Sequence, residues 1–122
     1  MSTRILRVNE LIHREIGAIL RKRYQSEAVT ITITGVEVTP DLREGRVYVA
    51  VTGDDAHVAD RFKWIRHHAR AIRHELARNL VLKQMPLLTY EIDTVTERGN
   101  RVLDLLDQLK AEETKTEPPA GD

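Results

Sequence analysis

A segment near the middle of the chain, residues 62–76 (FKWIRHHARAIRHEL), carries four Lys or Arg side chains and three His side chains but a single acid, Glu75. Guanidinium and ammonium groups of this kind neutralise phosphates and position a protein on a nucleic acid. A helix face that is merely solvated would mix the two signs, with opposite charges paired three or four residues apart. The segment therefore predicts a surface that binds a polyanion.

The formal charge of the 122-residue chain is zero, but the charges are sorted by segment. The net formal charges are +4 for residues 1–25, −5 for 26–60, +6 for 61–83, −1 for 84–103 and −4 for 104–122. Blocks of one sign on a small domain create a directional field whatever the total charge is. We expect one strongly positive surface on an otherwise neutral molecule.

The basic side chains of the central segment separate from its apolar ones on an ideal helical wheel. The apolar arc comprises Val58, Phe62, Ile65, Ala69, Ile72, Leu76 and Leu80. The candidate contacts to a nucleic acid are Lys63, Trp64, Arg66, Arg70, Arg73 and Arg78. Two roles are open for Trp64, because an indole can stack on a base or pack beneath a neighbouring element.

A second row of arginines lies on the first helical segment, where Arg7, Arg14 and Arg21 are spaced seven apart and fall on one side of the wheel. This row either extends the nucleic-acid surface or is ordinary helix charge, favoured near a helix C-terminus.

Catalysis and metal binding have little support in the residue types. His67 and His74 share a face but lie about 10.5 Å apart along an ideal helix, which is too far to chelate one ion. The chain has no Cys, and its serines, Ser2 and Ser26, lack the strand-to-helix context of a nucleophile. We therefore predict a protein that is not an enzyme and that has no metal and no cofactor.

The hydrophobic period predicts the elements that position these side chains. Apolar residues three and four apart predict helices over 4–24, from about 55 to 80, and, for a short last one, over 102–109. Alternation of β-branched and polar residues predicts strands over 29–38, 47–52 and 87–92. Residues 40–45 have turn chemistry and make the first two strands a hairpin, and residues 53–55 offer carboxylate caps to the long helix.

The order α-β-β-α-β predicts a two-layer α+β domain, with a three-stranded sheet packed against helices. This is the chain order of the type II KH domain, a single-stranded nucleic-acid binder, although no two glycines have the Gly-x-x-Gly spacing of the KH phosphate clamp. We expect one KH-like RNA-binding domain over residues 1–110 and an acidic, disordered tail over 111–122.

Several motifs together resemble the ribosome-binding factor A family. They are residues 34–42 (TGVEVTPDL), 47–49 (VYV), 86–93 (PLLTYEID) with Gly99, and the first-helix pairs Arg7-Val8, Glu15-Ile16 and Ile19-Leu20. The resemblance covers about residues 5–109. It implies a KH-like fold and a non-enzymatic factor that binds the immature small ribosomal subunit and its ribosomal RNA, assists late RNA maturation, and matters most for growth in the cold.

Members of that family typically interrupt the second helix with an Ala-x-Gly element, which aligns here with His68-Ala69-Arg70. Because a positive φ is costly without glycine, we expect a gentler break at this point. The lack of Cys, of a signal peptide and of any long apolar run favours a cytoplasmic protein with no membrane association. We also expect a monomer. The alternative function is a protein-interaction module whose basic helix binds an acidic protein partner.

Overall fold

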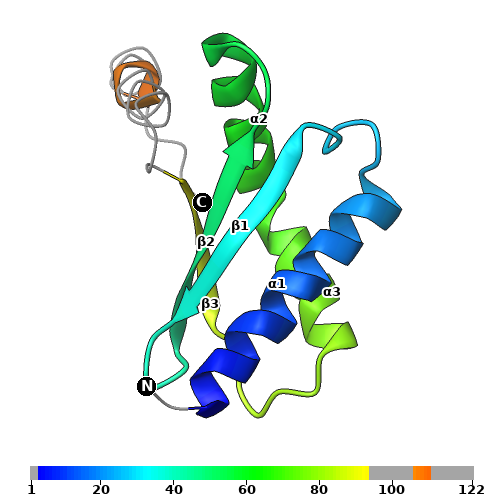
Figure 1. Cartoon of the computed structure of the whole chain (residues 1–122), viewed down its shortest axis with the longest axis vertical. Helices are drawn as coiled ribbons and strands as arrows, with labels where there is room; N and C mark the ends of the chain where they lie inside the picture. The colour runs from blue at the N-terminus through cyan, green and yellow to red at the C-terminus, as the bar shows by residue number, and fades with distance from the viewer. Residues whose placement is uncertain (1–2, 94–105, 111–122) are drawn as a thin grey trace.

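The structure, a computed structural model, describes residues 3–93 and 106–110. Its elements are α1 (Thr3–Arg23), β1 (Ile31–Val38), β2 (Glu44–Val51), α2 (Asp55–His67), α3 (Ala69–Asn79) and β3 (Leu87–Ile92). The α+β class, the three-stranded sheet and the order of elements agree with the predictions from the sequence (Figure 1).

The sheet has the order β1-β2-β3, with β1 antiparallel to β2 and β2 parallel to β3. Apart from an irregularity between Ile33 and Gly35 in β1, the more buried and more exposed residues alternate along the strands, as expected for a sheet covered on one face only. On the covered face, α1 packs against β1, α2 packs against β2 and β3, and α3 packs against β3 and against α1. The domain is therefore built of two layers, and β1 and β3 are its edge strands.

The hairpin between β1 and β2 is tighter than the sequence suggested, because the second strand starts at Glu44 rather than at Val47. Gly45 pairs with Val38 and with Leu88 on either side. A Cβ atom at Gly45 would lie 2.9 Å from the Leu88 side chain and 3.1 Å from that of Val38. A side chain at position 45 would force Leu88 or Val38 to shift, so close packing between strands favours glycine here. Gly45 belongs to the second strand, whereas the predicted hairpin itself is confirmed.

The first strand starts later than predicted, at Ile31 instead of Val29. Val29 is 78% exposed and lies in the connection from α1, so its β-branched side chain continued the sequence pattern without belonging to the sheet.

The core joins the stripes predicted on the helices to the inner face of the sheet. Its fully buried large side chains are Ile12, Ile16, Val47, Val49, Ile65, Ile72, Leu76 and Pro86. Asp54 caps α2 as expected, because its carboxylate accepts a hydrogen bond of 2.8 Å from the His57 backbone N–H. These contacts fix the rotation of α2 and hence the direction in which its basic side chains point.

The long helix is broken into α2 and α3 at His68, which has φ −93° and ψ 5°. Its backbone N–H lies 3.1 Å from both the Trp64 and the Ile65 carbonyl oxygens, and its ring Nδ1 lies 2.8 Å from the Trp64 oxygen. The break therefore has no positive φ, as expected at a position that lacks glycine.

At the C-terminal end, residues 106–110 are helical, and Leu106 packs against the core. The remainder of the helix predicted over 102–109, and the predicted tail over 111–122, lie outside the described residues.

Candidate nucleic-acid interface

On α2, the predicted side chains Lys63 and Arg66 are exposed, as is His67 beside them. The three line a groove of about 450 Å³ whose other wall is the helical segment 106–110. The Arg66 guanidinium lies 5.7 Å from the centre of the Phe62 ring, a cation–π contact that holds the side chain over an apolar support. One acid, Asp107, also borders this groove.

On α3, Arg70 and Arg78 are exposed, and within residues 3–93 and 106–110 neither forms an ion pair. The only acid of the helix, Glu75, is instead bound by Arg23 of α1 at 2.8 Å. We refer to Lys63, Arg66, Arg70 and Arg78 as the α2–α3 basic face. The guanidinium groups of Arg66, Arg70 and Arg78, which form no ion pair with a described residue, remain available to an anion that approaches from solvent.

Arg73 differs from these neighbours. Its Nε donates to the Pro86 carbonyl oxygen at 3.1 Å and its Nη2 donates to the Met85 oxygen at 2.9 Å. The side chain is only half exposed and ties α3 to the loop that leads into β3. The helical wheel grouped Arg73 with the solvent-facing cations, but a wheel does not show that a loop folds back over the helix. A contact of Arg73 to RNA therefore stays a prediction.

Trp64 lies in an aromatic cluster and is half-buried. Its ring meets Tyr24 edge-on at a centroid distance of 5.2 Å and lies against His68 at 4.4 Å, with the Arg61 guanidinium at 5.7 Å. Of the two roles left open by the sequence, this geometry favours packing: the indole joins the end of α1 to the break between α2 and α3.

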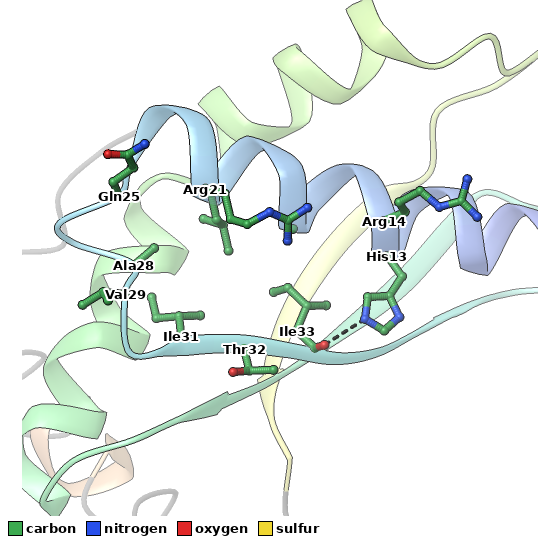
Figure 2. Close-up of a pocket in the computed structure, with 11 residues that line it drawn as sticks. His13, Arg14, Arg21, Gln25, Ala28, Val29, Ile31, Thr32 and Ile33 are labelled. Carbon is green, nitrogen blue, oxygen red and sulfur yellow. Dashed lines mark hydrogen bonds between the residues drawn. The ribbon is translucent and has the colours of Figure 1, made fainter.

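The arginine row of α1 lies apart from the α2–α3 basic face. Arg7 is exposed, Arg14 forms an exposed ion pair with Glu10 at 3.1 Å, and Arg21 lies beside the groove between α1 and β1 (Figure 2). No residue of α2 or α3 lines that groove. The row therefore faces a different surface from the one formed by the two later helices.

Two polar side chains of α1 that the sequence did not single out bind the outer edge of β1. The Asn9 Oδ1 atom accepts a hydrogen bond of 2.9 Å from the Val38 N–H, and His13 Nε2 lies 2.8 Å from the Ile33 carbonyl oxygen. Asn9 and His13 are four residues apart, on the same side of the helix and next to the buried Ile12. A polar pair at this spacing beside the apolar stripe is the feature of the sequence that could have identified them.

Within residues 3–93 and 106–110, no three His, Cys, Asp or Glu side chains gather where a metal ion could be held. The same described parts of the chain contain no helix that is both long enough and apolar enough to cross a bilayer.

The chain matches one family of known proteins over most of its length. The family model described as ribosome-binding factor A matches residues 4–106. The ribosome-binding factor A of Opitutus terrae is 49% identical over 109 residues, covering 89% of both chains, and that of Akkermansia muciniphila is 37% identical over 120 residues, covering 98% of this chain and 94% of its own.

Two solved structures share the fold at low sequence identity. The solution structure of a Thermotoga maritima protein aligns with a TM-score of 0.66 at 20% identity, covering 80% of this chain and 93% of that one. The crystal structure of ribosome-binding factor A from Thermus thermophilus aligns with a TM-score of 0.61 at 15% identity, covering 70% and 92%. The fold is thus the KH-like fold of those structures, and the chain belongs to the ribosome-binding factor A family.

Proposed function

We propose that this protein is a non-catalytic ribosome assembly factor that binds the immature small ribosomal subunit and assists late maturation of its RNA. Family membership supports a ribosomal partner, since the relatives are named for ribosome binding. The observation that carries the RNA contact is the α2–α3 basic face, whose Arg66, Arg70 and Arg78 are exposed and have no ion pair among the described residues.

The mechanism is positional. Cations of the α2–α3 basic face neutralise phosphates of an RNA segment, while the rigid packing of α2 and α3 against the sheet fixes the orientation of the domain on that segment. The RNA is held in place until neighbouring contacts of the subunit form. No bond is made or broken by the protein itself.

The charge distribution favours release as well as binding. The total formal charge is zero, and the region of the β1–β2 hairpin is acidic, so only one surface attracts RNA strongly. A factor of this kind leaves when the subunit matures, because the remaining contacts do not retain it. We therefore expect a cytoplasmic protein that acts as a monomer on free small subunits.

An acidic protein partner on the same basic face is the second candidate, because exposed arginines without ion pairs would also suit carboxylates. The dependence of binding on salt concentration distinguishes the two candidates. Binding to single-stranded RNA through Z phosphates weakens with a log-log slope of about −0.7Z, which is about −3 for four contacts.

The experiment is fractionation of cell extracts on sucrose gradients, with the protein detected by an antibody. We expect it with free small subunits, most of all with immature ones, and not with assembled ribosomes. Arg66→Glu combined with Arg70→Glu should move it to the ribosome-free fractions. The matched control is Arg43→Glu with Lys83→Glu, which makes the same change of charge at exposed positions away from α2 and α3. Equal loss in both double variants would refute the assignment to this face.

A further inference from the structure

The groove between α1 and β1, which has a volume of about 750 Å³, has no role in the proposed function. Figure 2 shows it bounded above by α1, which carries His13, Arg14 and Arg21, and below by the start of β1. Because β1 is an edge strand, the groove exposes one side of a strand backbone as well as side chains.

Some of the backbone hydrogen-bonding groups on that edge of β1 already have partners. The Ile31 N–H donates to the Ala28 oxygen at 3.0 Å, and His13 Nε2 lies 2.8 Å from the Ile33 oxygen. Thr30 and Thr32 direct their backbone groups toward β2, as the bond from the Thr52 N–H to the Thr30 oxygen shows. The alternation of an antiparallel ladder therefore turns the Ile31 carbonyl and the Ile33 N–H toward the groove.

Those two groups have no partner within the described residues. An extended segment lying along β1 can donate to the first and accept from the second, which gives two backbone hydrogen bonds. His13 closes the edge on one side and the Ala28 turn closes it on the other, so the site has room for a short stretch of extended chain only.

The side chains around the groove define what that chain must carry. Val29 is 78% exposed, and the accessible edges of the otherwise buried Leu20, Ala28, Ile31 and Ile33 complete an aliphatic lining. No Phe, Tyr or Trp lines the groove. Nucleobases bind single-stranded sites by stacking on aromatic rings, which this groove lacks. Aliphatic side chains of a peptide fit the surface instead.

The charge at the groove is basic. Arg21 is exposed and forms no ion pair with a described residue, and its guanidinium is folded back toward Gly17. A Cβ atom at Gly17 would lie 3.2 Å from Arg21 Nη1, so the glycine leaves room for this side chain in the middle of α1. The groove thus presents a cation beside the unpaired backbone groups of β1 (Figure 2).

We infer that the α1–β1 groove is a second interaction site, which binds a short extended peptide of another protein that alternates aliphatic and acidic residues. The peptide adds to the edge of β1 at Ile31 and Ile33, its aliphatic side chains contact Leu20, Ala28 and Val29, and a carboxylate pairs with Arg21. The site is independent of the α2–α3 basic face, so a protein partner and RNA can be bound at the same time.

The test is a titration of the ¹⁵N-labelled protein with a synthetic heptapeptide of alternating valine and glutamate, followed by amide chemical shifts. We expect shifts centred on Ile31 and Ile33. Replacing every glutamate by lysine, methylating the peptide backbone nitrogens, or introducing Arg21→Glu should each weaken binding at least about tenfold, the loss expected for one charge-assisted or backbone contact. Arg66→Glu, on the α2–α3 basic face, should leave it unchanged.

Three results would overturn the inference. The first is a binding constant that does not change when the peptide backbone is methylated, or no binding at millimolar concentrations of the peptide. The second is an oligouridine that produces the same shifts and displaces the peptide, which would make the groove part of the RNA surface. The third is truncation after Lys110 that itself shifts the Ile31 and Ile33 amides, which would identify the chain's own acidic C-terminal residues as the occupant. None of these results bears on subunit binding through the α2–α3 basic face.

Discussion

Replacing Arg73 by alanine tests the division of the arginines into structural and RNA-contacting ones. The change removes two charge-assisted hydrogen bonds, to the oxygens of Met85 and Pro86, in a half-buried position. Hydrogen bonds to charged groups contribute about 1.5–3 kcal/mol each. Because one anchored side chain makes both bonds, their contributions are not additive, and we expect the free energy of unfolding to fall by about 2–4 kcal/mol rather than by the full sum.

Urea denaturation followed by circular dichroism measures this difference. The midpoint should fall in Arg73→Ala while the dependence of the free energy on urea stays the same, since the unfolded chain is little changed. Arg70→Ala is the matched control, because Arg70 is exposed on the same helix and should alter stability by less than about 0.5 kcal/mol. If the two variants were equally stable, the loop anchor would contribute nothing and the reasoning from its geometry would fail.

Three further predictions concern other parts of the molecule. Gly17→Ala should raise the free energy of unfolding by up to about 1 kcal/mol from helix propensity, since the added Cβ meets only the movable end of Arg21; a loss of stability in urea would contradict this. Burial raises the pKa of the Tyr90 hydroxyl above its ordinary value of about 10, so its contribution to folding stability is complete below pH 10 and is lost as the pH rises further. Between pH 8 and 11, the free energy of unfolding should therefore fall less in Tyr90→Phe than in the unchanged protein. Identical pH dependences of the two proteins would count against this prediction. Arg66→Ala should reduce the salt slope of RNA binding by about 0.7 if it contacts one phosphate, whereas an unchanged slope would remove it from the interface.

Local periodicity was sufficient to predict most of the fold. The stripes through Ile12 and Ile16 on α1, and through Ile65, Ile72 and Leu76 on the later helices, are buried as expected, because one apolar face per helix leaves a single way to cover the sheet. The lack of glycine at the helix break also predicted its form, since a residue other than glycine disfavours positive φ.

The sequence was least informative where a side chain depends on a segment distant in the chain. Gly45 packs closely against Leu88, and Arg73 donates hydrogen bonds to the loop at Met85 and Pro86. Neither partner can be predicted from the spacing of nearby residues. The same limit applies to His13, whose bond to Ile33 joins positions 20 residues apart. Charge and period predict which face of a helix is polar, but only the tertiary arrangement shows which of its cations are already bound.

Ultraviolet crosslinking of the protein to RNA in growing cells, with sequencing of the RNA and mass spectrometry of the peptide adducts, tests the central claim most directly. We predict RNA fragments from the small subunit, enriched in unprocessed precursors, attached to peptides of α2 and α3. Adducts confined to large-subunit RNA, or to peptides of α1 and β1 with none on α2 or α3, would contradict it.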